Sequence, residues 1–328
     1  MLRKSLLCAA LMLTACGRNS TEGDAFREGL PSQETVEVKA PAKAGQGLEV
    51  EAQAKGGQSD TYAWTRGATV VVNGGTAWVL TLLEKITEHT PTSLADKTAV
   101  WGPHTEALSP NTWKLTVTQT AEHGYSYVLE AKAKSAADSE YKVILSGSHT
   151  VAVDANGQRK KHFGSGSFLI DWDAAQTLPE HDNQVGRAEI RYARPDTASA
   201  VTVEADFRQV RDADRPGTRV DADYRYKATP GAGGEFDFAV DKNIDRGTER
   251  PAIEHLTIKS RWQQDGAGRS DVQASGGDLG TQEASISECW DTHFASQVLL
   301  ISYAPFFNYG TEASECAFST AVYSSLSK

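Results

Sequence analysis

The sequence predicts a mainly β protein of the α+β class, folded as a wide antiparallel meander or half-barrel of about ten strands with one amphipathic helix on its apolar face. Apolar and polar residues alternate along nine runs, at 113–117, 125–131, 141–145, 168–172, 188–192, 201–207, 220–226, 236–240 and 256–262. This period of two is typical of strands with one buried face. Short turn sequences such as 215–217 and 230–234 separate the runs, and turns of that length join only antiparallel neighbours.

The same alternation assigns the two faces of the predicted sheet. One face carries charged and hydroxyl side chains, for example Glu204, Asp206 and Arg225, and is expected to face water. The other face is aromatic and is the candidate surface for a lipid or another hydrophobic ligand. Its candidate ligand-contacting residues are Tyr192, Phe207, Tyr224, Tyr226, Phe236, Phe238 and Trp262. A core filled by these same side chains is the alternative interpretation.

One amphipathic helix is predicted over residues 76–89. The residues spaced i, i+3, i+4 and i+7, as on one buried helical face, are Val79, Leu82, Leu83 and Ile86. The segment 73–75, Asn-Gly-Gly, is expected to precede the helix. Thr90 and Pro91 are expected to end it, because the residue before proline avoids the α region. The helix is the natural cover for the apolar face of the sheet.

The N-terminus has the features of an export signal. A basic start at Arg3 and Lys4 precedes a short apolar run, too short to span a membrane. The residues Leu13-Thr14-Ala15-Cys16 resemble the lipobox of bacterial lipoproteins. This resemblance implies cleavage of a signal peptide at 1–15, followed by attachment of diacylglycerol and an N-acyl chain, such as palmitate, to Cys16. The alternative is an ordinary secretory peptide with a coincidental cysteine.

The lipobox resemblance also implies a location and a membrane partner. By the sorting rule of enteric lipoproteins, Gly17 after Cys16 directs the protein to the outer membrane. The lipid on Cys16 then attaches the protein to that membrane. Which side of the membrane it faces and which proteins it meets stay open.

Domain organisation follows from composition. Residues 16–60 are rich in Gly, Ala, Glu and Lys and show no lasting apolar period, which predicts a disordered tether. Residues 61–328 are predicted to form a single β-rich domain. Once Cys16 is lipidated, Cys289 and Cys316 are left in an oxidising compartment, where they are expected to form a disulfide that closes the C-terminal section. A metal pair or redox pair is the alternative, but the two lack CxxC spacing.

The net charge and the absence of known motifs argue against two classes of function, nucleic-acid binding and catalysis. The formal net charge is −10, and no basic cluster lies on a nucleic-acid-binding motif, so a nucleic-acid partner is not expected. The eight histidines form no HxH, HxxxH or HExxH pattern, which favours a protein that is not an enzyme. The stretch 164–168, Gly-Ser-Gly-Ser-Phe, is not a GxSxG nucleophile motif. We interpret it as small residues entering a hairpin strand.

No cofactor or metal is predicted. The one weak calcium candidate is the segment containing Asp241, Asn243 and Asp245, whose side-chain oxygens recur at alternate positions. Asp and Asn are also ordinary turn residues, and this second interpretation fits the predicted meander.

A helix on the apolar side of a wide antiparallel meander resembles the half-barrel of lipoprotein carriers and receptors of the LolA/LolB type. The resemblance covers residues 69–271, lies in the architecture and transfers no functional residue. It implies a cavity for an acyl chain or another hydrophobic ligand. The alternative function is a structural or protein-interaction lipoprotein without a ligand cavity, and a hydrolase is the third hypothesis.

Overall fold

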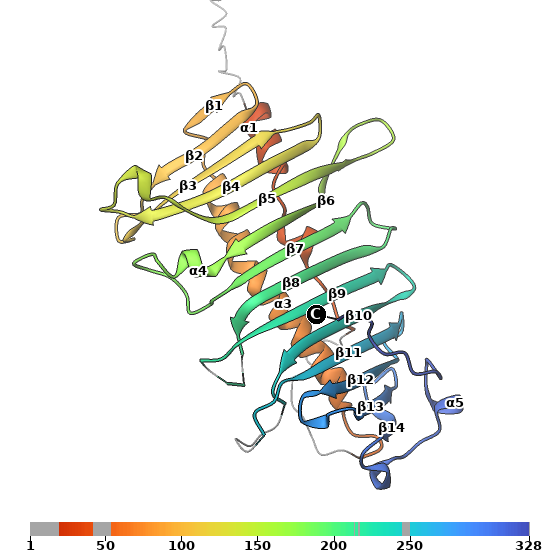
Figure 1. Ribbon diagram of the computed structural model, residues 1–328. Helices are drawn as coiled ribbons and strands as arrows, with labels where there is room; N and C mark the ends of the chain where they lie inside the picture. Colours follow the sequence, from red (N-terminus) through yellow and green to blue (C-terminus); the bar gives the residue numbers. More distant parts are fainter. Residues whose placement is uncertain (1–19, 42–53, 213, 216, 245–249, 328) are drawn as a thin grey trace, which may run out of the picture.

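The protein is built on one open sheet of fourteen antiparallel strands that follow one another in chain order (Figure 1). The computed structural model describes residues 20–41, 54–212, 214–215, 217–244 and 250–327. The strands are β1 (Ser93–Ala95), β2 (Thr98–His104), β3 (Asn111–Gln119), β4 (Gly124–Ala133), β5 (Lys142–Val153), β6 (Arg159–Asp171), β7 (Arg187–Arg194), β8 (Val201–Arg211), β9 (Arg219–Thr229), β10 (Gly233–Lys242), β11 (Glu254–Gln263), β12 (Gly268–Gly276), β13 (Glu283–Trp290) and β14 (Ser296–Ile301).

The predicted mainly β meander is confirmed, but the prediction of about ten strands was too low. Strands β3 to β11 coincide with the nine alternating runs. The missed strand β12 shows why the count fell short. Its residues Gly268 to Val272 are all buried, because the strand is covered on both faces, so polar side chains occupy buried positions and the alternation disappears.

A long helix, α3 (Asp60–Thr87), crosses the strands on one face of the sheet (Figure 1). The prediction of a helix beginning at residue 76 was wrong, because the helix continues through Asn73-Gly74-Gly75. Each glycine in a helix destabilises it by about 1 kcal/mol relative to alanine. The tertiary packing of a whole helix face stabilises the helix by more than this. Asn73 also has a specific role, since its side chain accepts a hydrogen bond from the Val38 N–H at 3.0 Å and donates one to the Val38 carbonyl at 2.9 Å.

The inward stripe predicted for this helix is largely confirmed. Val79 and Leu83 are 0% and 1% exposed, and Leu82 and Ile86 pack against the core with partial exposure. Leu80, at 3% exposure, completes the buried side. The first half of α3 buries Tyr62, which is 0% exposed, and beyond it smaller residues, among them Thr65 and Thr69.

The tether predicted over residues 16–60 is wrong for its described parts. Residues 20–41 contain α1 (Ser20–Glu28) and α2 (Gln33–Val36) and lie on the same face of the sheet as α3. The apolar residues that hold this segment are Phe26, Leu30, Val36 and Val38, each at most 8% exposed. They are too few and too unevenly spaced to give a period, so the sequence pattern missed them. The segment runs antiparallel to α3, from Arg27 beside the Thr87 carbonyl to the Pro41 carbonyl beside the Tyr62 hydroxyl.

The opposite face of the sheet is charged, as predicted, over its central strands. Arg191 on β7 pairs with Glu204 and Asp206 on β8, and Lys259 on β11 pairs with Glu235 and Asp237 on β10. These cross-strand pairs join neighbouring strands on the side away from α3. Most are partly solvent-exposed, so each pair adds little to stability.

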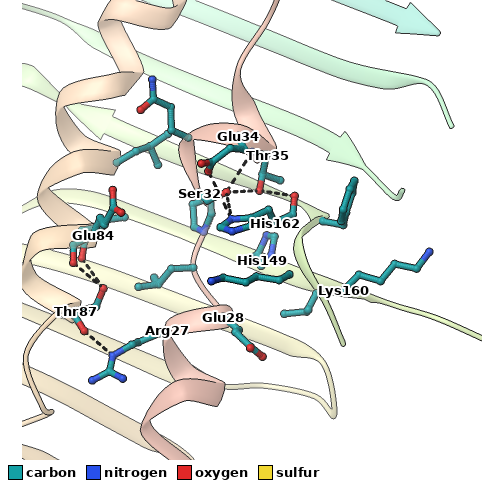
Figure 2. A pocket seen from close by; sticks show the side chains of 18 residues that line it. Arg27, Glu28, Ser32, Glu34, Thr35, Glu84, Thr87, His149, Lys160 and His162 are labelled. Atoms are coloured by element: carbon teal, nitrogen blue, oxygen red, sulfur yellow. Dashed lines mark hydrogen bonds and ion pairs between the residues drawn. The ribbon is translucent and has the colours of Figure 1, made fainter. Parts of the chain in front are cut away.

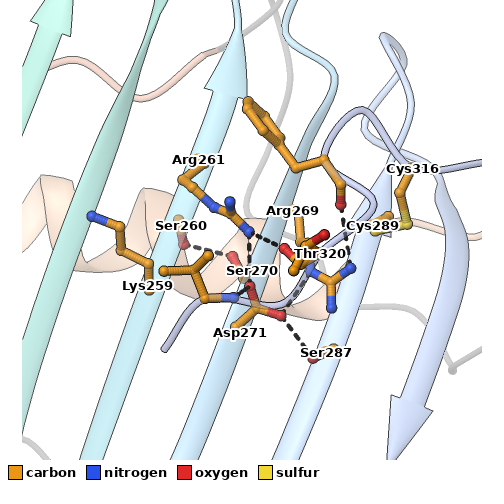
Figure 3. Close-up of polar contacts among 12 residues, drawn as sticks. Lys259, Ser260, Arg261, Arg269, Ser270, Asp271, Ser287, Cys289, Cys316 and Thr320 are labelled. Atoms are coloured by element: carbon orange, nitrogen blue, oxygen red, sulfur yellow. Dashed lines mark hydrogen bonds and ion pairs between the residues drawn. A yellow bond between two sulfur atoms is a disulfide. The ribbon is translucent and has the colours of Figure 1, made fainter. Parts of the chain in front are cut away.

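The C-terminal segment 311–327 covers this outer face at β11 to β13 (Figure 3). The predicted disulfide between Cys289 and Cys316 is present and fixes the segment to β13. Beneath it, Arg269 and Asp271 are fully buried, and the Asp271 carboxylate accepts hydrogen bonds from four donors. The donors are Arg269 Nε, Ser287 Oγ, an Arg261 guanidinium nitrogen and the Val322 N–H.

The packing of α3 predicts a sharp difference between neighbouring helix positions. We expect Leu83→Ala to lower the free energy of unfolding by about 2–5 kcal/mol, the range for emptying a packed core site. The adjacent Glu84→Ala, at an exposed position, should lower it by about 0.5 kcal/mol or less. Chemical denaturation of both variants measures the difference. Equal and small shifts would mean that α3 does not form part of the core.

Candidate functional site

The aromatic face predicted to contact a hydrophobic ligand is the protein core. Six of its seven residues, Tyr192, Phe207, Tyr224, Tyr226, Phe236 and Trp262, are at most 8% exposed, and Phe238 packs against the same cluster. α3 and the segment 20–41 cover these side chains. The structure therefore brings the seven residues together, but it fills the space above them with the protein's own side chains.

A cavity of about 270 Å³ remains beside this core (Figure 2). It lies between the N-terminal segment, the C-terminal half of α3 and strands β5 and β6. Its apolar walls come from Leu30, Leu80, Leu83 and Val151, and charged residues surround its mouth. The cavity is slightly smaller than the usual ligand site of about 300–1,000 Å³. It joins parts of the chain that are more than a hundred residues apart.

A buried histidine, His149 on β5, lines this cavity. Its side chain is 3% exposed, and its Nδ1 atom shares a hydrogen bond of 2.7 Å with the Tyr192 hydroxyl. Among the described residues, its Nε2 atom makes no hydrogen bond. Burial lowers the pKa of His149 to about 4, so the imidazole is neutral at pH 7. Burial likewise raises the pKa of Tyr192 far above its ordinary value.

Three glycines make room for this histidine and its tyrosine neighbours. A Cβ atom at Gly164 would lie 2.4 Å from the His149 ring, and one at Gly166 would lie 2.8 Å from the Tyr192 hydroxyl oxygen. A Cβ atom at Gly147 would lie 2.6 Å from the Tyr127 hydroxyl oxygen. No side chain larger than hydrogen fits these positions without rearrangement. The small residues at 164–168, interpreted from sequence as a strand entry, therefore also shape the site.

Sequence reasoning missed His149 as a site residue. The available signal was the pair of glycines at 164 and 166, which share one face of β6, opposite a histidine on the neighbouring strand. Register pairs Gly166 with His149, but the sequence alone does not supply that register. The lining residues between positions 27 and 35 lay in the segment that was predicted to be a tether.

A second histidine, His162, lies at the mouth of the cavity, near lysine and glutamate side chains. His162 Nδ1 lies 3.2 Å from Ser32 Oγ and 3.5 Å from a Glu34 carboxylate oxygen. A hydrogen bond from the Glu34 backbone N–H is the main cause that lowers the pKa of this carboxyl. Serine, histidine and glutamate are the residue types of a catalytic triad. In a triad, however, the nucleophile and the acid contact different ring nitrogens, whereas here both contact Nδ1.

A second, more open pocket of about 510 Å³ borders two of the predicted ligand-face residues, Tyr226 and Trp262. It is also lined by Lys39, Pro41 and Arg194. The Tyr226 hydroxyl donates a hydrogen bond to the Lys39 carbonyl and accepts one from the Lys39 N–H. These two aromatic rings therefore meet the surface at one end of the core, while the rest of the aromatic face stays covered.

The side chains of Asp241 and Asn243, from the weak calcium candidate, make contacts with other protein groups. Asp241 lies 2.8 Å from His255 Nδ1. The Asn243 side chain accepts a hydrogen bond from the Arg215 guanidinium and donates one to the Arg250 carbonyl. Asp245 lies outside the described residues, as does Cys16. Within the described ranges, no cluster of three or more His, Cys, Asp or Glu side chains has the arrangement of a metal site.

Comparison with known proteins found no matching protein family, no matching curated protein and no matching solved structure. Among the described helices, none is both long enough and apolar enough to span a membrane.

The buried, neutral His149 predicts a specific pH dependence of stability. Because its folded pKa is about 4 and its unfolded pKa is about 6.5, the unfolded state binds more protons between these values. Stability is therefore retained above about pH 6.5 and lost as the pH falls toward 4. The lost contribution is about 3 kcal/mol for a shift of this size. In His149→Gln, which cannot titrate, the difference in unfolding free energy between pH 7 and pH 4 should be smaller by up to that amount.

Denaturation curves at a series of pH values measure this effect. The control is His181→Gln, which removes an exposed histidine and should leave the pH profile unchanged. A His149→Gln profile that is parallel to the wild-type profile would contradict the assignment of His149 as a buried neutral group.

Proposed function

We propose that the protein is a membrane-anchored lipoprotein of the bacterial outer membrane, held by lipid on Cys16, that acts as a structural or protein-interaction module. The signal peptide and lipobox resemblance of residues 1–16 support the anchor. The filled aromatic face supports the structural or protein-interaction role. In this proposal the architecture is a half-barrel whose interior is occupied by α3 and residues 20–41.

The filled face supports an interaction module rather than a ligand carrier, the other main hypothesis. A carrier of the LolA/LolB type needs space between helix and sheet for acyl chains. Here Tyr224 and Phe236, at the centre of that space, are 1% and 0% exposed, and their rings lie 5.0 Å apart. Opening such a site would break packing along α3, which favours an interaction module over a carrier of complete lipids.

A small amphiphilic ligand in the His149 cavity is the second candidate function. The observation in its favour is a neutral imidazole whose Nε2 atom lacks a protein partner among the described residues, at the floor of a space with leucine and valine walls. Lys160 and Lys161 line the same cavity. A short acyl chain with a carboxylate or carbonyl group fits this chemistry, whereas a diacyl lipid exceeds the volume.

Two measurements test the proposed function. Wild-type protein should fractionate with membranes and carry acyl groups on an N-terminal cysteine, whereas Cys16→Ser should stay unprocessed or be released. Native mass spectrometry of the domain freed from its anchor should show no stoichiometric bound phospholipid. An N-terminus without acyl groups would refute the anchor, and a bound phospholipid would favour the carrier over the interaction module.

A further inference from the structure

We propose that the side of α3 that faces away from the sheet lies on the surface of a lipid bilayer. This inference rests on the proposed anchoring through Cys16 and adds a second membrane contact. The protein would then lie flat, with the helical face toward the membrane and the charged outer face of the sheet exposed to protein partners.

The first observation is an exposed apolar stripe on α3. Trp64, Val70 and Val71 are 42%, 56% and 67% exposed. Trp64 and Val71 are seven residues apart and so lie on one side of the helix. Gly67 and Gly74 lie on the same side, and a Cβ atom at either position would meet no other atom within 4 Å. This side is therefore apolar, flat and open.

The second observation is the charge distribution along α3. Between Thr61 and Leu83 the only charged residue is Arg66, which lies over the Tyr62 ring. A helix that covers a sheet normally presents charged residues to water on its outer side. The outer side of α3 lacks them over about 35 Å of its length, at 1.5 Å per residue. Such a surface is expected to contact an apolar phase or another apolar surface.

The third observation selects the membrane as the apolar phase. Cys16 precedes the first residue of α1, Ser20, by four residues, and four extended residues span at most about 14 Å. α1 lies on the same face of the sheet as α3. Arg27 on α1 donates hydrogen bonds to the Thr87 and His89 carbonyls at the end of α3. A lipid on Cys16 therefore brings the end of α3 close to the bilayer.

The contact is parallel to the membrane rather than across it. No described helix can span a bilayer, and an interfacial helix needs only its outer side in the boundary between headgroups and acyl chains. Tryptophan is enriched at this boundary, and Trp64 lies at the end of α3 far from the anchor. With a net charge of −10, attraction to anionic lipids does not contribute, so the contact should depend little on salt.

The test uses the lipidated full-length protein in phosphatidylcholine vesicles. A fluorophore is attached to Val71→Cys, since Cys16 would be acylated and Cys289 and Cys316 are bridged. The matched control is Leu169→Cys, an apolar residue on β6 that is 39% exposed on the opposite face of the sheet. Both variants should keep the wild-type denaturation midpoint, because both positions are exposed.

Lipids that carry a quencher in the acyl chain should quench the fluorophore at position 71 several-fold more than the fluorophore at position 169. The mass of the N-terminal peptide is determined on the same sample. An acylated Cys16 with equal, weak quenching at both positions would refute the membrane contact and leave the anchor intact. An unmodified Cys16 would refute both. Fluorophore self-quenching that rises with the protein-to-lipid ratio at position 71 alone would identify a second copy as the occupant and also refute the proposal.

Discussion

The structure depends on the burial of one face of a very wide sheet. Fourteen strands at about 4.8 Å spacing extend over about 60 Å, and every inward side chain on them requires a cover. α3 supplies that cover with an interface that changes along its length. Leucine and valine pack at its C-terminal half. At its N-terminal half buried threonines donate to carbonyls one turn earlier, as Thr65 does to Thr61 and Thr69 to Thr65.

In the N-terminal half of α3, buried hydroxyl groups form hydrogen bonds with one another, so polar residues are tolerated in this interface. The Thr65 hydroxyl lies 2.6 Å from Ser260 Oγ on β11, and Ser260 Oγ lies 2.5 Å from Ser270 Oγ on β12. The hydroxyls thus satisfy one another where no water reaches them, as buried polar groups must. Small hydroxyl residues also let the helix approach the sheet closely. Residues 20–41 cover part of the same face beside α3, and residues 311–327 cover part of the outer face.

The sequence predicted those parts of the fold that are covered on one face only. Strands β3 to β11 alternate because one side meets α3 and the other meets water. β12 did not alternate, since Ser270 is buried under Thr65 and Asp271 under the C-terminal segment. The first half of α3 was obscured by Val70, Val71 and two glycines, whose low helix propensity is outweighed by packing.

The candidate site was less predictable than the fold, because it depends on register. His149 meets Gly166 and Tyr192 only once β5, β6 and β7 are paired. The disulfide was predictable from the cysteine count and from the oxidising compartment that the lipobox resemblance implies. The aromatic residues were correctly grouped on one face, but whether a ligand or the chain itself covers them depends on residues 20–41, whose few apolar side chains have no period.

Residues 26–38, α3 and the sheet pack together, and we expect them to unfold as one cooperative unit. Amide hydrogen exchange of the native protein tests it most directly at Val38, whose N–H donates to the Asn73 side chain. We expect this amide and those of Leu80 and Leu83 to exchange as slowly as the amides of the central strands, through global unfolding. Rapid exchange at Val38 and along residues 26–38, with the sheet still protected, would show that this segment is not part of the cooperative core.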